Sequence, residues 1–244
     1  MRAERVRDLV VLDDLVIACD SVGGIGDKPG DAVWADARTV AHFGARVPLL
    51  EVLCAGADPL VVIDALSVER HPSGEAMIAE IESMVADLGD VVVTGSTEEN
   101  VRVTATAIAV SVIGRTRPGG VRPGGGCPGD VVLCLGLPRS APAHRVRIGL
   151  PEIVGIDEVR AVLGVSGVHD ALPVGSRGIA HELDELARTA GLVGRPVEAP
   201  VDMQASGGPA SCVLIACAPD SVDAVRGAVA ARLPVHVIGT LALA

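Results

Sequence analysis

The chain has 244 residues, of which 49% are hydrophobic, and its 20 lysines and arginines against 31 aspartates and glutamates give a formal net charge of -11. This acidic balance, with no basic run anywhere, argues against nucleic acid or an anionic membrane surface as a partner, because both require clustered positive charge. Apolar runs such as residues 60–63 stop far short of the roughly 20 residues that span a bilayer, and the N-terminal residues carry no secretion signal, so we expect a soluble, cytoplasmic protein.

The first half of the chain predicts strands alternating with helices. Residues 15–19 and 60–66 are apolar runs typical of buried strands. Between them, apolar residues recur at helical spacing from Val40 to Cys54, and a second amphipathic helix is expected from Met77 to Leu88, just before Gly89. A short strand is expected at residues 91–93, and the alternation along residues 101–113 predicts a long strand with two different faces.

Glycine and proline dominate residues 115–129, so this stretch is the natural boundary between two domains. We expect an N-terminal domain at residues 1–126 and a C-terminal domain at residues 127–244, each close to a usual domain size. In the second, apolar runs predict strands at residues 131–135, 212–218 and 235–238, with helices at 179–190 and from 219 onward. Strand and helix alternate in both halves, which indicates an α/β or α+β fold.

Residues 20–31 follow directly on the first predicted buried strand and contain Lys28, the only lysine of the chain. Glycines let backbone amides approach phosphate oxygens, a lysine supplies mobile positive charge, and a carboxylate such as Asp20 can hold a divalent cation. The segment is not a P-loop, because Pro29 follows the lysine, and it lacks the third glycine of a dinucleotide fingerprint. A flexible surface loop is the alternative, but the lone lysine favours phosphate contact.

Two other places in the first half carry concentrated polar chemistry. Residues 94–100 hold three hydroxyls, two carboxylates and an amide, a set that can contact a metal ion, a ribose or a nucleotide edge. A polar turn explains this composition equally well. Glu51 stands within an otherwise apolar helix, so it needs a cation or a basic partner unless it lies on the solvated face.

In the second half, residues 173–179 form a glycine-rich turn that leads into a predicted helix, whose free amides favour anions. Arg177 adds positive charge there, although a plain turn fits as well. The cysteines in apolar runs are interpreted as small buried hydrophobes, and the six histidines show no spacing typical of zinc. These cysteines are Cys19, Cys54, Cys134, Cys212 and Cys217.

Several of these motifs occur together in an order typical of one superfamily. They are Asp20-Ser21-x-Gly23 with Lys28, then Gly56-Ala57-Asp58-Pro59, then Thr94-Gly95-Ser96-Thr97-Glu98, and Gly129-Asp130 at the start of the second half. The set resembles aminoimidazole ribonucleotide synthetase-like proteins, which include thiamine-monophosphate kinase, selenophosphate synthetase and a hydrogenase maturation factor. Over nearly the whole chain the motifs are most similar to those of α-ribazole kinases. The synthetase usually has Gly-Gly-Glu-Thr-Ala-Glu where this chain has Gly95-Ser96-Thr97-Glu98-Glu99, and usually an aspartate where this chain has Glu51. These differences argue against the purine-pathway reaction.

The resemblance implies a two-domain fold and a homodimer in which the N-terminal sheets pair, with ATP and Mg²⁺ held between the glycine-rich segment and the dimer interface. Asp20 and Glu51 would bind the magnesium ion. Lys28 would contact the transferring phosphate, with Asp20 beside it and Glu98 or Glu99 as a candidate base. The ATP-binding positions would be Ser21, Gly23, Gly24, Gly26, Lys28, Thr94, Gly95, Ser96 and Thr97, and the substrate-binding positions Glu99, Asn100, Ser176 and Arg177.

The activity implied is an ATP-dependent kinase that phosphorylates the 5′-hydroxyl of α-ribazole during nucleotide-loop assembly of cobalamin. Phosphoryl transfer depends mainly on positioning and charge neutralisation, which a glycine-rich loop, one lysine and metal-bound carboxylates provide. Two alternatives remain at this stage. One is a superfamily kinase for another nucleoside or vitamin, and the other is a dimeric binding or maturation module without ATP turnover.

Overall fold

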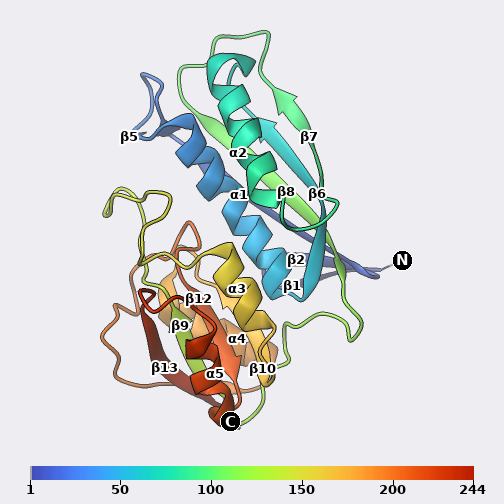
Figure 1. Cartoon of the computed structure of the whole chain (residues 1–244), viewed down its shortest axis with the longest axis vertical. Coiled ribbons are helices and arrows are strands. Elements are labelled where there is room, and N and C mark those ends of the chain that lie inside the picture. Colours follow the sequence, from blue (N-terminus) through green and yellow to red (C-terminus); the bar gives the residue numbers. More distant parts are fainter. Residues whose placement is uncertain (1) are drawn as a thin grey trace. The chain divides into compact units, whose positions relative to one another are not determined.

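The computed structural model describes residues 2–244, which form two compact units (Figure 1). The first unit ends at Pro118, and the second holds Gly119–Ala244 together with Leu53–Gly56. The sequence-based boundary, after residue 126, falls eight residues later than this division (126 minus 118). The glycine-rich residues belong with the second unit because Arg122 donates to the Val168 carbonyl at 2.8 Å and the Gly124 amide to the Asp170 carboxylate at 3.0 Å.

The first unit is a six-stranded sheet in the order β1-β2-β3-β8-β6-β7, with two helices. Strands β3 and β6 each run antiparallel to β8, and β7 runs parallel to β6, so β3, β6 and β7 all point the same way. The elements are β1 (Ala3–Val6), β2 (Leu9–Leu12), β3 (Leu15–Gly23), β4 (Ile25–Gly26), β5 (Val33–Trp34), α1 (Ala37–Cys54), β6 (Ala57–Leu66), the π-helical turn η1 (Arg70–Gly74), α2 (Glu75–Val85), β7 (Val92–Thr97) and β8 (Ala107–Thr116).

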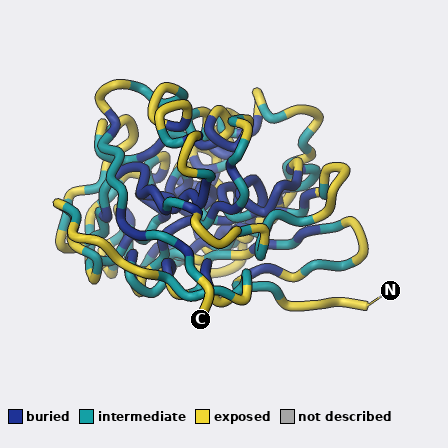
Figure 2. Tube along the Cα trace, turned by 90° about the horizontal axis from the view of Figure 1, so that it is seen from below, coloured by how far each residue is buried: buried dark blue, intermediate teal, exposed yellow. Residues whose placement is uncertain are grey.

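Helices α1 and α2 lie side by side over one face of this sheet (Figure 1), where Glu80 of α2 binds Arg38 and His42 of α1. The strands alternate accordingly: every second residue of β8 from Ile108 to Gly114 is buried under the helices, as are Val16 and Ala18 of β3. A Cβ at Gly44 of α1 would press against Ile108 of β8, so the helix approaches the sheet closely there. Figure 2 shows buried positions along the strands and helices and exposed positions mainly at the turns.

Five sequence-based boundaries in this unit were wrong. Strand β3 continues to Gly23 instead of ending at residue 19, and β6 begins at Ala57 instead of residue 60. Strand β8 begins at Ala107 rather than at residue 101, because the amides of Val103 and Thr106 donate to the side chains of Glu69 and Asp31 instead of to a neighbouring strand. Strand β7 continues through residues 94–97, which pair with β6. Helix α2 ends at Val85 instead of Leu88.

The second unit is a five-stranded antiparallel sheet in the order β10-β12-β9-β13-β11. Its elements are β9 (Val131–Leu135), α3 (Ile156–Leu163), β10 (Val168–Pro173), α4 (Gly178–Thr189), β11 (Val193–Pro196), β12 (Val213–Cys217), the 3-10 turn η2 (Pro219–Ser221), α5 (Val222–Gly227) and β13 (Val235–Ala242).

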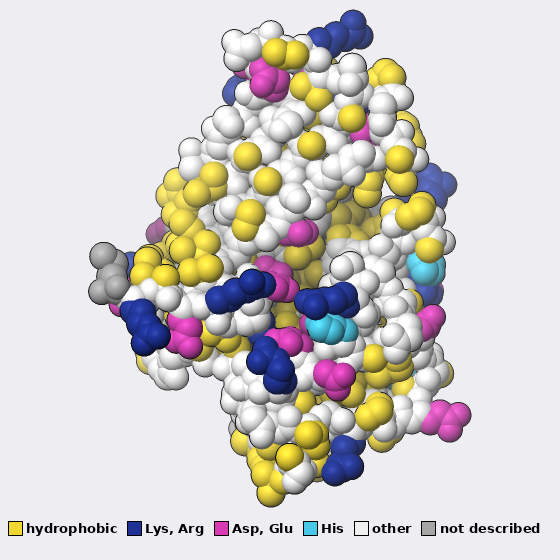
Figure 3. All heavy atoms as spheres, turned by 180° about the vertical axis from the view of Figure 1, so that it is seen from behind, with side chains coloured by type: hydrophobic (Ala, Val, Ile, Leu, Met, Phe, Trp, Pro, Cys, Tyr) yellow, Lys and Arg dark blue, Asp and Glu magenta, His cyan; other side chains and the backbone are white. Residues whose placement is uncertain are grey.

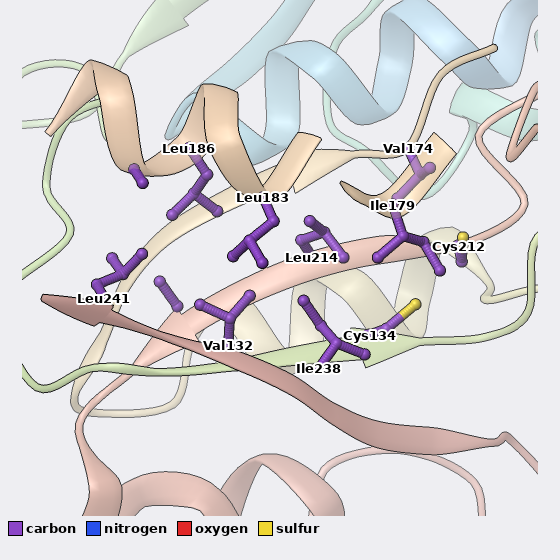
Figure 4. Packing of buried hydrophobic residues seen from close by; sticks show 12 residues of the cluster. Val132, Cys134, Val174, Ile179, Leu183, Leu186, Cys212, Leu214, Ile238 and Leu241 are labelled. Carbon is purple, nitrogen blue, oxygen red and sulfur yellow. The ribbon is translucent and has the colours of Figure 1, made fainter. Parts of the chain in front are cut away.

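The core of the second unit lies between this sheet and α4. Figure 4 shows Val132, Leu214 and Ile238 pointing toward Leu183 and Leu186 of the helix. Every residue of β12 is buried, which agrees with helices on both faces of the sheet and with the uninterrupted apolar run seen in the sequence. Burial on this scale is the main source of folding free energy, at about 25 cal/mol per Å² of apolar surface.

Four of the five cysteines that we expected to be buried are buried, but Cys19 is exposed, because it lies on the face of β3 opposite the helices. None of the helices within residues 2–244 has the length and hydrophobicity needed to cross a membrane.

Candidate functional site

Three strands of the first unit end at one edge of the sheet. Gly23 at the end of β3 pairs with Ala107, and Leu66 at the end of β6 pairs with both Ile108 and Thr97. The segments that follow these strands, namely the glycine-rich loop, residues 67–70 and residues 98–100, therefore begin at the same edge. In open α/β sheets ligands bind outside the carboxyl ends of the strands. We call this edge the carboxyl-end edge.

Two carboxylates lie on one row of the sheet just inside this edge. Asp20 of β3 and Asp64 of β6 both pair with Val110 of β8, and both stand on the helix-covered face. Two strand spacings of about 4.8 Å place their Cα atoms roughly 10 Å apart. That separation suits a magnesium ion that keeps part of its water shell, as Mg²⁺ usually does in proteins.

Asp64 is the more buried of the two, with 2% of its surface exposed. Its Oδ2 has no hydrogen-bond partner among residues 2–244, and a Cβ at Gly95 would overlap its carboxylate, so only glycine fits beside it on β7. Burial raises the pKa of Asp64, and the negative charge of Glu82 raises it further. Burial also raises the pKa of Asp20, against the effect of a hydrogen bond from the Ser21 amide. A cation would offset the cost of keeping these groups charged.

Lys28 lies at the same edge and forms an ion pair with Glu69, which follows β6. Only 13% of the lysine side chain is exposed. The second oxygen of Glu69 accepts from the Val103 amide at 3.0 Å, and the bonds from Lys28 and Val103 lower the pKa of Glu69 to about 2. Glu69 is therefore charged at neutral pH, and an anionic ligand would have to share or replace it at the lysine.

The glycine-rich loop is tied to residues 104–106 by its backbone and by Asp31. The Asp31 carboxylate accepts from the Thr106 amide and hydroxyl, both at 2.7 Å, and from the Lys28 amide at 2.9 Å. Burial alone would raise the pKa of Asp31, but these bonds outweigh it and lower the pKa. A Cβ at Gly26 would overlap Asp31 and Thr106, and Gly24 has a φ of +71°, so these two glycines are needed to fold and dock the loop.

Residues 94–100 divide between a strand and a turn. Thr94, Gly95, Ser96 and Thr97 belong to the edge strand β7. The Glu98 carboxylate accepts from the amides of Asn100 at 2.7 Å and Val101 at 3.1 Å, which lowers its pKa. Glu99 accepts from the Thr97 hydroxyl at 2.7 Å and from the Arg70 amide at 3.2 Å. Both carboxylates thus fix the turn beside Glu69, and a role for either as a base stays a prediction.

Glu51 lies at a different level of the sheet from Asp20. It is half-buried on α1 and takes part in a polar interaction within the chain. Its neighbour Val52 packs on Gly114, four residues along β8 from the Val110 row (114 minus 110). At about 3.3 Å per residue this is roughly 13 Å. A magnesium ion shared by Asp20 and Glu51 stays a prediction, and Asp64 is the second carboxylate on the row of Asp20.

Ser176 and Arg177 lie in the second unit, exposed, in the turn before α4. Gly178 has a φ of +83° and packs against the backbone of residues 204–205. The first free amides of the helix are partly used, since Ala180 donates to the Met203 carbonyl at 2.9 Å. Binding of substrate by Ser176 and Arg177 stays a prediction.

Sequence reasoning missed Asp64 and Glu69. A signal for Asp64 existed, because an aspartate inside the apolar run of residues 61–66 is unusual in a buried strand. Its alignment with Asp20 required the strand register, which the sequence does not contain. Glu69 gave no signal beyond its place in a polar segment, and only the fold brings it to Lys28.

Residues 7–116 match the family model described as AIR synthase related protein, N-terminal domain. No curated protein matches the sequence. Among solved structures, the HypE-HypF complex has a TM-score of 0.70 at 14% identity, covering 97% of this chain and 87% of that chain. Thiamine-monophosphate kinase from Stenotrophomonas maltophilia K279a has a TM-score of 0.61 at 16% identity, covering 97% and 87%. T. maritima PurL complexed with ATP has a TM-score of 0.67 at 17% identity, covering 97% of this chain and 42% of that chain.

At these identities the structural likeness establishes the fold. The chain has the AIR synthase-like fold, and the part of its first unit at residues 7–116 is similar to the AIR synthase-related N-terminal domain. This confirms the fold class expected from the ordered motifs around Asp20, Asp58 and Glu98.

Proposed function

We propose that the protein binds Mg-ATP at the carboxyl-end edge and transfers the γ-phosphate to the 5′-hydroxyl of α-ribazole. The observation that carries the proposal is the meeting of Asp20, Asp64 and the Lys28–Glu69 pair at one edge of the sheet. Solved structures of the same fold include HypE and PurL with ATP, and a thiamine-monophosphate kinase. The choice of α-ribazole rests on the motif resemblance described above.

Each group has a distinct task in this proposal. Asp20 and Asp64, with Glu51 as a further candidate, would hold the magnesium ion. The ion would supply charge neutralisation between the β- and γ-phosphates. Lys28 would exchange Glu69 for a phosphate oxygen when ATP arrives, so its charge would be available only with nucleotide present. This exchange needs only side-chain rotation, because Glu69 stays anchored to the Val103 amide.

The acceptor would bind largely to aliphatic side chains, since the chain has no tyrosine, one phenylalanine and one tryptophan. That tryptophan, Trp34, is 71% exposed and pairs with Gly26 of the glycine-rich loop. An exposed indole beside the loop is a suitable surface for stacking the flat base of a nucleoside.

A substrate panel tests the proposal and separates it from its alternatives. Purified protein with Mg-ATP is offered α-ribazole, purine and pyrimidine nucleosides, thiamine and thiamine monophosphate, and ADP release is measured. We expect release above background with α-ribazole. Release with another acceptor only would identify a different kinase. Binding of ATP without release for any acceptor would favour the dimeric binding or maturation module.

We also propose that the first unit pairs with a second copy through the sheet face opposite the helices. On this face an apolar row crosses four strands through Val10, Ile17, Ile113 and Val61, which are register neighbours. Ile63 on the same face is 39% exposed. Figure 3 shows hydrophobic side chains gathered on the side of the molecule turned away from α1 and α2. A continuous apolar sheet face of this kind is typical of a buried interface, and light scattering of the purified protein measures its mass.

A further inference from the structure

The second unit brings together three side chains whose atoms are metal ligands. One atom each of Cys127, Asp130 and His169 lies within 4.8 Å of the other two. They come from positions 127, 130 and 169 of the chain, so no sequence spacing indicates the cluster. All three belong to the second unit, whereas the residues of the carboxyl-end edge belong to the first.

The cluster is held in place by its own hydrogen bonds. Asp130 is buried, its Oδ2 accepts from the Cys127 amide at 2.8 Å, and both its oxygens lie 3.0 Å from Nδ1 of His169. The amide of Leu241 in β13 donates to the Asp130 carbonyl at 2.9 Å, which fixes the backbone. Cys127 is exposed and 33% of the His169 side chain is exposed, so solvent reaches the site at two of the three ligands.

Strand β10 is irregular where it supplies the histidine. The pairing of β10 with β12 shifts its register between Val168 and Asp170, so His169 occupies a β-bulge. Bulges redirect a side chain and recur beside functional sites. Residues 124–125, in the stretch rich in glycine and proline at residues 115–129, pack directly against this bulge. The Gly124 amide donates to Asp170, and a Cβ at Gly125 would meet the His169 carbonyl at 2.6 Å.

We propose that Cys127, Asp130 and His169 bind a borderline transition-metal ion of the Zn²⁺ class, with a fourth position open to water. Thiolate sulfur, imidazole nitrogen and carboxylate oxygen are the ligands that zinc prefers, and three protein ligands with one open position are typical of an accessible zinc site. In a tetrahedral site, ligand atoms are roughly 3.5 Å apart. The Asp130–His169 separation of 3.0 Å is close to this value, and the three ligand atoms lie within 4.8 Å of one another.

Binding of the metal ion releases a proton from the site. The Cys127 thiol loses its proton to solvent when the sulfur–metal bond forms, and the metal replaces the hydrogen bond between His169 and Asp130. Because the three ligands tie residues 124–130 to β10, the ion stabilises these residues at the start of the second unit.

The test uses the full-length protein, freed of metal by chelation and titrated with Co²⁺ and then Zn²⁺. We expect one Co²⁺ per chain with a thiolate-to-cobalt absorption band, its displacement by Zn²⁺, and a higher melting temperature with Zn²⁺. Cys127→Ser should abolish the band and weaken Zn²⁺ binding at least about tenfold. His169→Gln should weaken binding similarly while circular dichroism shows an intact fold.

The matched control is Cys19→Ser, because Cys19 is the other exposed cysteine among residues 2–244 and lies in the first unit. It should bind both metals as the wild type does. The proposal is overturned if the wild type binds no Co²⁺ or Zn²⁺ at micromolar concentrations. It is equally overturned if Cys127→Ser keeps the band, or if Cys19→Ser loses it.

Discussion

The substitution Asp64→Asn tests two properties of the buried carboxylate separately: the folding stability that its charge costs, and its binding of a divalent cation. Asparagine has nearly the same shape, so the packing against Gly95 is kept, and Oδ2 of Asp64 has no hydrogen-bond partner within residues 2–244 that the change would remove. The substitution removes only the negative charge. We expect the variant to be more stable than the wild type near neutral pH in the absence of divalent cations.

The magnitude follows from the raised pKa of Asp64. Each unit by which folding raises a carboxyl pKa costs about 1.4 kcal/mol of stability once the group is ionised. Protonated Asp64 favours the folded state. Its stabilising contribution is complete below the unfolded pKa of 3.8 and is lost as the pH rises through the folded pKa. An unsatisfied buried polar group costs about 1–3 kcal/mol, and the amide retains part of that cost, so we expect a gain of about 1–2 kcal/mol.

The assay is urea unfolding of wild type and Asp64→Asn between about pH 4 and pH 7, with and without Mg²⁺. The free energy of unfolding of the wild type should fall more steeply with rising pH than that of the variant. Added Mg²⁺ should stabilise the wild type and leave the variant unchanged. Asp90→Asn, at an exposed position, is the control and should behave as the wild type. A variant less stable than the wild type by more than about 1 kcal/mol without Mg²⁺ would refute the reasoning, because the carboxylate would then be satisfied in the folded protein.

Three further predictions test the loop, the lysine and the interface. Lys28→Ala should lower the ATP turnover rate by about 10²-fold or more. Glu69→Gln removes the ion-pair partner of the lysine and should tighten ATP binding, measured by calorimetry. A Glu69→Gln variant with the same effects on binding and turnover as Lys28→Ala would contradict the exchange of Glu69 for a phosphate oxygen. Thr106→Val removes one hydrogen bond to the loop and should cost about 1 kcal/mol in urea unfolding and speed proteolysis of residues 24–31; unchanged proteolysis would argue against docking by this bond. Ile17→Glu should convert a dimer to a monomer in light scattering, whereas Val101→Glu, at an exposed position in the segment before β8, should not.

The elements that sequence predicted well are those whose own residues carry the pattern. Strand β9 was predicted with its bounds, and the helical spacing from Val40 to Cys54 gave most of α1, because both bury apolar side chains at regular intervals. Strand β10 was missed. It contains His169 and Asp170, and Asp170 is fully buried because a distant amide, that of Gly124, binds it. Local sequence contains no record of such a partner.

The candidate site, too, was predictable only where its own residues form a local pattern in the sequence. The glycine-rich loop and Lys28 stand out in the sequence, and the structure brings them to the carboxyl ends of three strands. Two features depended on strand register and loop docking, which are tertiary properties. They are the alignment of Asp64 with Asp20 across Val110, and the pairing of Lys28 with Glu69.

The transfer of label from [γ-³²P]ATP to α-ribazole tests the central claim most directly. The protein is incubated with Mg²⁺, labelled ATP and α-ribazole, and labelled nucleoside, inorganic phosphate and ADP are separated and counted. We predict one labelled nucleoside 5′-phosphate for each ADP formed, and no transfer by Lys28→Ala. Label that remains in ATP, or that appears only as inorganic phosphate, would contradict the account.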